Sequence, residues 1–173
     1  KSMVTEVFIT ATAAYLPLEP VGNDEIEQVL GMVGGRPSKA RRVVLRNNGI
    51  RQRHYALDRH TGQATMTNAQ MAARAVQALG SLETVDLLAA ATSCPDQLMP
   101  GHGVMVHGEL GWPHLEVVSL AGICVAGMAA FTLLPLGILQ LIASIDHGYW
   151  FARSAEFMQQ PIVEMLVWMR VPA

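Results

Sequence analysis

The chain is predicted to be an α/β protein with a mostly parallel sheet covered by helices on both faces. Segments rich in β-branched and apolar residues alternate along it with segments whose apolar residues have helical spacing. Of its 173 residues, 51% are hydrophobic and only 15% are charged, which excludes a disordered chain. This length suits a single domain over residues 1–173 with a sizeable core.

The first third of the chain is expected to hold one strand, one short helix and a long loop. β-branched and aromatic residues predict a strand over 4–16, which Pro17 ends. Asn23 is a suitable cap for the short amphipathic helix that follows it. Glycines end this helix, and a basic loop is expected to continue to a turn at Asn48 and Gly49.

The remainder of the chain is expected to alternate between helices and apolar strands. Thr67 and Gln70 have the spacing of a capping box, which predicts a helix that begins there and runs to Leu79. The further elements are expected in this order: a fully buried strand over 85–92, a short helix over 100–110, a buried strand over 115–123, a helix to about 145, and a strand over 149–157.

Charge is unevenly distributed along the chain. The net charge of −2 gives no general attraction to nucleic acid, so no nucleic acid partner is expected. However, eight of the twelve Lys and Arg residues lie between Arg36 and Arg59. This basic segment could bind a phosphate group or an acidic protein. A solvated loop that carries several arginines is the alternative.

An uncharged run over 117–145 is long enough to cross a bilayer. A buried strand followed by a buried helix explains the same absence of charge. The second interpretation is preferred, because the run begins like a strand and contains Pro135 and several glycines. No membrane association is therefore expected. The first residues also lack the apolar core of a signal peptide.

Cys124 is the candidate nucleophile. It follows an apolar strand, lies between Gly122 and Gly127, and precedes a segment of small apolar residues that can form a helix. Free N–H groups at a helix N-terminus favour a thiolate and can also stabilise an oxyanion. Ligands of parallel sheets bind beyond the carboxyl ends of the strands, where this cysteine falls. A buried structural cysteine is the alternative.

The other candidate side chains are expected to be structural. Cys94 is assigned to packing, and Asp96 to shaping the loop around it. With only two cysteines in apolar surroundings, the chain has no disulfide framework and suits a reducing cytoplasm. His102, His107 and His114 lack an acidic or cysteine residue at a metal-binding spacing, so no metal is expected. No phosphate-binding glycine motif is present, and no cofactor is predicted.

Several segments, in this order, resemble the N-terminal half of thiolase-superfamily condensing enzymes of the β-ketoacyl-acyl-carrier-protein synthase III kind. Within that group the resemblance is greatest to ketosynthases of aryl-polyene, dialkylresorcinol and flexirubin pathways. It covers roughly residues 4–130. The matching segments are YLP, NDEIEQVLG, LRNNGIRQRHYA, TNAQMAARAVQAL, VDLLAAATSCPDQLMPGHGVMVHGELG and EVVSLAGICVAGMAA.

The resemblance implies a thiolase-like mixed sheet and an acyltransferase of fatty acid or polyketide biosynthesis. Cys124 would accept an acyl group from a thioester, and a malonyl thioester would then be decarboxylated and condensed with that group. Arg46, Arg51 and Arg53 would contact an acidic acyl carrier protein or coenzyme A. The coenzyme-A-stacking Trp of the family falls near Val43, which favours the carrier protein. A homodimer, or a heterodimer with a related ketosynthase, is also implied.

Two departures from the family pattern leave alternatives open. If the glycines are aligned with those of synthase III, Val125 takes the place of the nucleophile and the protein is inert. The family's catalytic His and Asn come from the C-terminal half, and none of the six histidines here occupies those positions. A non-catalytic partner subunit of a ketosynthase is therefore the second hypothesis. A small membrane-anchored protein is the third.

Overall fold

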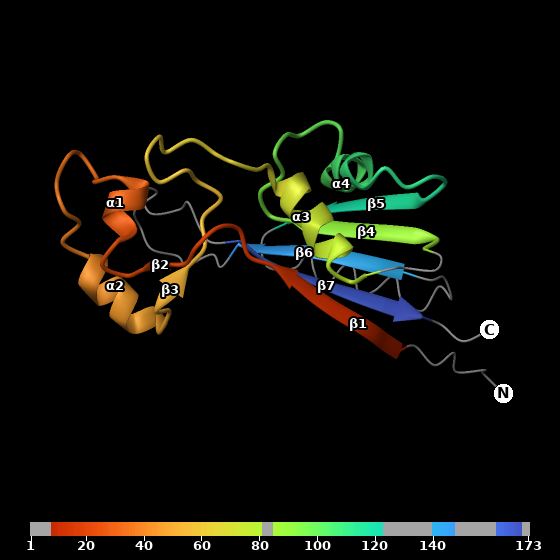
Figure 1. Ribbon diagram of the computed structural model, residues 1–173, viewed down its shortest axis with the longest axis horizontal. Helices are drawn as coiled ribbons and strands as arrows, with labels where there is room; N and C mark the ends of the chain where they lie inside the picture. The colour runs from red at the N-terminus through yellow and green to blue at the C-terminus, as the bar shows by residue number, and fades with distance from the viewer. Residues whose placement is uncertain (1–7, 81–84, 123–139, 148–161, 171–173) are drawn as a thin grey trace. The chain divides into compact units, whose positions relative to one another are not determined.

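The computed structural model describes residues 8–80, 85–122, 140–147 and 162–170 (Figure 1). The chain divides into two compact units. The sheet unit comprises residues 1–15, 67–147 and 163–173, and the basic unit comprises residues 16–66 and 148–162. The expectation of one domain over the whole chain stays a prediction.

The sheet unit is built on a five-stranded sheet with the strand order β1-β7-β6-β4-β5. The pairing is parallel where β4 meets β5 and β6, and antiparallel where β1 meets β7. These strands are β1 (Phe8–Tyr15), β4 (Leu87–Thr92), β5 (Glu116–Ala121), β6 (Gln140–His147) and β7 (Ile162–Arg170). The predicted α/β class is confirmed, and the antiparallel β1–β7 pair makes the sheet a mixed one.

The position of β4 between two parallel partners explains its sequence, LLAAAT. All six of its residues are buried, as expected for a strand covered on both faces. By contrast, β5 was expected to be buried and is not, since Glu116, Ser119 and Ala121 are exposed. The reason is that β5 is the last of the described strands on its side of the sheet.

The two helices in the described part of the sheet unit are α3 (Asn68–Gln77) and α4 (His102–Leu110), and they contact each other and the sheet. The predicted capping box of α3 is confirmed. Thr67 Oγ1 accepts a hydrogen bond from the Gln70 N–H at 3.1 Å, and Gln70 Oε1 accepts one from the Thr67 N–H at 3.1 Å. The buried residues of α3 are Ala69, Met71, Ala72, Ala73, Ala75 and Val76.

The predicted helix up to residue 145 is wrong at its end, because residues 140–147 form β6. A long apolar run does not reveal its own period, and parallel pairing with β4 decides the structure here. Residues 123–139 and the predicted strand over 149–157 lie outside the described residues. The uncharged run therefore begins and ends in strands of one sheet. Among the described residues, no helix has both the length and the apolar character needed to cross a membrane.

The basic unit has a small core of its own, formed by Val21, Ile26 and Tyr55. Two short strands, β2 (Val21–Gly22) and β3 (Gln52–Arg53), pair antiparallel beside this core. Among the described residues the unit also contains two helices, α1 (Ile26–Leu30) and α2 (Arg41–Asn48). Partly buried apolar side chains surround the core: Val29, Leu30, Leu45 and Leu57.

The predicted basic loop is wrong over part of its length, because Arg41–Asn48 form helix α2. Leu45 packs against the core of the basic unit, whereas Arg42 and Arg46 are exposed on the outside. Gly49 ends the helix with φ at +68°, in the left-handed conformation that favours glycine. The Asn48–Gly49 signal therefore marks a helix C-terminus rather than a separate turn. The density of glycines and charges around this short amphipathic segment concealed it.

Asp58 organises the loop that follows β3. Its Oδ1 accepts hydrogen bonds from the Thr61 N–H at 2.7 Å, the His60 N–H at 2.9 Å and the Thr61 hydroxyl at 3.0 Å. These bonds favour the charged carboxylate, and the Thr61 N–H contributes most to lowering the pKa of Asp58.

The wild type is expected to be more stable than an Asp58→Asn variant at neutral pH, and this difference in stability is expected to shrink at low pH. Because the pKa of Asp58 is lower in the folded chain, its carboxylate stabilises the fold above the ordinary pKa of about 3.9. That contribution is lost as the pH falls through the lowered pKa. Urea unfolding between about pH 7 and pH 2 should show the wild-type advantage over Asp58→Asn shrinking as the pH falls. An advantage that stays constant with pH would contradict this account.

Candidate functional site

The carboxyl ends of β4 and β5 lie side by side, since Thr92 is paired with Ala121 in parallel register. The Gly122 N–H extends this pairing by donating to the Thr92 carbonyl oxygen at 3.4 Å. Cys124 is two residues further along the chain, outside the described residues. The described part of the candidate site is therefore the sheet edge that precedes Cys124 and the loop that follows β4.

The loop after β4 is attached to α3 by Asp96. Its Oδ1 accepts from the Asn68 N–H at 2.7 Å, and its Oδ2 accepts from the Ala69 N–H at 2.9 Å. A carboxylate that accepts from the first N–H groups of a helix forms charge-assisted hydrogen bonds. Its negative charge also interacts favourably with the positive end of the helix dipole. Asn68 Nδ2 also donates to the carbonyl oxygen of half-buried Cys94 at 2.6 Å. The interpretation that Asp96 shapes this loop is confirmed.

The end of the same loop is held by a close approach between α4 and β5. The Gly103 N–H donates to Ser119 Oγ at 2.9 Å. A Cβ atom added to Gly101 would lie 2.8 Å from the same hydroxyl oxygen. Between these two attachments the loop exposes Leu98 and Met99, which are 87% and 82% accessible. The base of the loop is thus firmly held, and its tip is apolar.

The three candidate histidines have separate structural settings. His102 is buried at the start of α4, and His114 is exposed with φ at +43°. His107 Nε2 lies 2.6 Å from the Trp112 carbonyl oxygen. Since a carbonyl only accepts, this nitrogen must carry the proton. In the part of the chain that the structure describes, no group of three or more His, Cys, Asp or Glu side chains could hold a metal ion.

The three predicted carrier-binding arginines differ in their placement. Arg46 and Arg51 are exposed, whereas only 8% of Arg53 is accessible. Arg53 Nη1 donates to Asn23 Oδ1 at 2.6 Å. Burial lowers the pKa of Arg53 and raises the pKa of its neighbour Tyr55. Arg53 therefore has an internal partner, and Arg46 and Arg51 face solvent.

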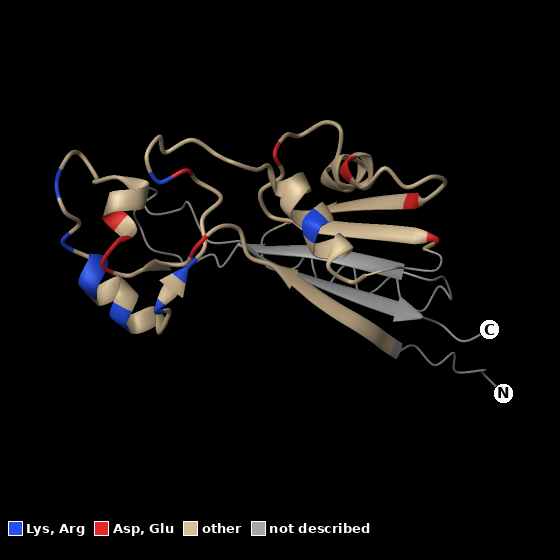
Figure 2. Cartoon of the chain, in the orientation of Figure 1, with Lys and Arg blue, Asp and Glu red and all other residues tan. Residues whose placement is uncertain are grey.

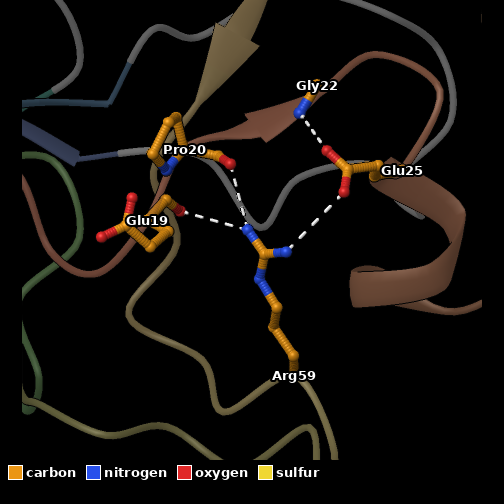
Figure 3. Close-up of polar contacts among 5 residues, drawn as sticks. All are labelled: Glu19, Pro20, Gly22, Glu25 and Arg59. Carbon is orange, nitrogen blue, oxygen red and sulfur yellow. Dashed lines mark hydrogen bonds and ion pairs between the residues drawn. The ribbon is translucent and has the colours of Figure 1, made fainter.

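Two further arginines of the basic segment also form internal contacts. Arg41 Nη1 lies 2.9 Å from Glu27 Oε2, and Glu27 Oε1 accepts from the Ser38 N–H at 2.8 Å. Figure 3 shows the second group, in which Arg59 Nη1 lies 3.7 Å from Glu25 Oε1. Its Nη2 donates to the carbonyl oxygens of Pro20 at 3.0 Å and Glu19 at 3.5 Å. These contacts stabilise the basic unit.

The five cations that remain are exposed, and no carboxylate of the described residues lies within ion-pair distance of them. Figure 2 shows that the Lys and Arg positions of the basic unit are concentrated on and around α2. The outer face of α2 combines Arg42 and Arg46, one helical turn apart, with Val43, which is 59% exposed. Such a face can bind phosphate or carboxylate groups. The five exposed cations are Arg36, Lys39, Arg42, Arg46 and Arg51.

No family model matches the chain. Among curated proteins, it is 33% identical over 119 residues to the β-ketoacyl-[acyl-carrier-protein] synthase III of Hyphomonas neptunium, which covers 68% of this chain and 34% of that protein. It is 30% identical over 123 residues to the synthase III of Paramagnetospirillum magneticum, covering 70% of this chain and 35% of that protein. The chain thus spans about a third of the length of these relatives.

Solved structures of condensing enzymes also match the chain. A tetronic acid condensing enzyme matches 97% of this chain and 53% of its own, with a TM-score of 0.73 and 27% identity. The 3-oxoacyl-(acyl carrier protein) synthase III of Pseudomonas aeruginosa matches 96% of this chain and 51% of its own, with a TM-score of 0.71 and 21% identity. The chain belongs to the β-ketoacyl synthase III-like condensing enzymes of the thiolase fold.

Proposed function

We propose that this chain carries the acyl-accepting nucleophile of a β-ketoacyl synthase III-like condensing enzyme, and that this nucleophile is Cys124. The observation that supports the proposal is the parallel register of β4 and β5, whose carboxyl ends lead into the Asp96 loop and toward Cys124. Ligands of parallel sheets bind at this edge. The relatives that share the sequence are synthases of the same kind.

The proposed chemistry has two steps. In the first, the Cys124 thiolate attacks the carbonyl carbon of an acyl thioester, and a new carbon–sulfur bond forms as the bond to the carrier sulfur breaks. The carrier leaves as a thiolate, which takes up the proton that Cys124 lost when it ionised. In the second, a malonyl thioester loses carbon dioxide, and the resulting carbanion attacks the acyl group on Cys124. A carbon–carbon bond forms, and the thiolate of Cys124 is released. Backbone N–H groups near the nucleophile would stabilise the oxyanion of each step.

The proposed donor is an acyl carrier protein, which is acidic. The exposed guanidinium groups of Arg46 and Arg51 are available to it, because no carboxylate of the described residues pairs with them. Charge complementarity of this kind accelerates encounter and selects the partner. Val43 offers no aromatic ring for coenzyme A to stack on, which favours the carrier protein over coenzyme A as the donor.

The proposed assembly is a dimer through the edge of the sheet, either of two copies or with a related ketosynthase. In the described residues β5 has one neighbouring strand, β4, so its other edge is available for pairing. A cytoplasmic location would suit the mechanism, since a reducing environment keeps Cys124 as a thiol.

Acyl transfer to Cys124 can be tested directly on the wild-type chain. Incubation with octanoyl-acyl carrier protein or octanoyl-coenzyme A, followed by peptide mass spectrometry, should locate one octanoyl group on the Cys124 peptide. The Cys94 peptide is the internal control and should stay unmodified, because its half-buried thiol is assigned to packing. Acylation confined to Cys94, or none at all, would overturn the proposal. An unreactive Cys124 in a chain that copurifies with a full-length synthase would favour the non-catalytic partner subunit.

A further inference from the structure

Arg53 is a buried cation whose one side-chain hydrogen bond within the described residues goes to a neutral side chain. It is 8% exposed, and its Nη1 donates to Asn23 Oδ1 at 2.6 Å. No carboxylate of the described residues forms an ion pair with it. A buried charge requires polar contacts to offset its desolvation. The amide of Asn23 therefore supplies a polar contact that offsets part of the desolvation of the Arg53 guanidinium.

The orientation of the Asn23 amide follows from its two partners. A guanidinium only donates, so the oxygen of the amide must face Arg53. A carbonyl only accepts, so the amide nitrogen must face Ile50, whose carbonyl oxygen lies 2.9 Å from Asn23 Nδ2. One side chain thus connects a buried cation in β3 to the backbone of the turn before it.

The turn that Asn23 holds is the one that ends α2. On its other side, the Ile50 N–H donates to Asn48 Oδ1 at 2.9 Å. Gly49 between them has φ at +68°. The backbone of Ile50 is therefore bound through both its N–H and its carbonyl. Arg46 precedes this turn and Arg51 follows it, so its conformation determines how the two exposed guanidinium groups lie relative to each other.

We infer that Asn23 and Arg53 are positioning residues, which hold the turn at Ile50 so that Arg46 and Arg51 are presented together to the carrier. This inference rests on the proposed function and adds to it the residues that arrange its binding surface. Asn23 and Arg53 themselves are not expected to contact the carrier, because Arg53 is buried and the amide of Asn23 is bonded through both its oxygen and its nitrogen within the basic unit.

The first test needs no ligand. Asn23→Asp keeps an oxygen for Arg53 but removes the donor to the Ile50 carbonyl, so the basic unit should still fold. Hydrogen exchange of the backbone amides of residues 49–53 is expected to become about tenfold faster in this variant, while that of α3 is unchanged. Gln28→Ala is the matched control, since it removes an exposed amide of the same unit that has no hydrogen bond within the described residues. Unchanged exchange at residues 49–53 would overturn the inference.

The second test measures the affinity of the full chain for octanoyl-acyl carrier protein. Asn23→Ala removes the side-chain hydrogen bonds to both Ile50 and Arg53, and it is expected to weaken binding about fivefold in the wild-type background. In an Arg46→Gln/Arg51→Gln background the same change should weaken it less than about twofold, because the positioned charges are already absent. A purely structural role would give equal losses in both backgrounds, which would overturn the inference.

The two tests separate this inference from the proposed function. If the Arg46→Gln/Arg51→Gln variant binds the carrier as tightly as the wild type, the carrier surface of the proposed function is wrong. In that case, faster hydrogen exchange in Asn23→Asp would still support the conclusion that the Asn23 side chain fixes the conformation of the turn at Ile50. If the double variant binds weakly but exchange is unchanged in Asn23→Asp, the carrier surface is supported and the positioning role is overturned.

Discussion

Replacing Cys124 with alanine is expected to abolish acyl loading, a loss on the order of a thousandfold or more. An alanine methyl group has no lone pair to attack a thioester, and the proposed chemistry assigns that step to no other residue. Loading is measured as the increase in intact mass after incubation with an octanoyl thioester. Urea unfolding of the same variant shows whether its fold is intact.

Cys94→Ala is the matched control for this prediction. It also removes one thiol from the chain, but from the loop that Asp96 attaches to α3. Loading should continue in this variant at a rate close to that of the wild type. Loading that survives in Cys124→Ala and disappears in Cys94→Ala would show that the nucleophile had been assigned to the wrong cysteine.

Gly103→Ala is expected to destabilise the sheet unit by about 2 kcal/mol, within the range for overpacked sites. The added Cβ would lie 2.9 Å from both Ser119 Oγ and Val117 Cγ1, and 3.1 Å from the Val118 carbonyl oxygen. The backbone oxygen cannot move without disturbing β5. This steric cost exceeds the gain of about 1 kcal/mol that alanine normally brings to a helix interior. Urea unfolding of wild type and variant measures the difference.

The same helix provides the control. Gly108 is exposed in α4, and a Cβ built on it meets nothing within 4 Å. Gly108→Ala should therefore stabilise the protein by up to about 1 kcal/mol, through helix propensity alone. A Val117→Ala change should recover part of the stability lost in Gly103→Ala, because it removes one of the clashing atoms. Equal effects of the two glycine changes would contradict the close α4–β5 packing.

The Gly103 contact also bears on the proposed site. It attaches the end of the Asp96 loop to β5, just as Asp96 attaches the beginning of that loop to α3. Both attachments are at the sheet edge from which the chain continues to Cys124. A looser α4 would disturb the loop at this edge, so Gly103→Ala is expected to affect the site as well as stability.

Local patterns in the sequence correctly predicted the elements that depend on neighbouring residues. The Thr67–Gln70 capping box needs only two side chains one helical turn apart, and it is present as predicted. Strand β4 could be predicted because a strand buried on both faces is apolar along its whole length, and its six residues are nearly all apolar. The resemblance to condensing enzymes was likewise carried by short segments in a fixed order, which the sequence and structural relatives confirm.

The sequence by itself determined the α/β class, the family and the cysteine proposed as nucleophile. Only the tertiary structure decided that residues 140–147 pair as a strand beside β4, and that Asp96 caps a helix 28 residues earlier in the chain. It also decided that Arg46 and Arg51 are exposed and that Arg53 is buried. The physical reason is that burial and long-range pairing depend on partners far apart in the chain, which local composition and spacing do not encode.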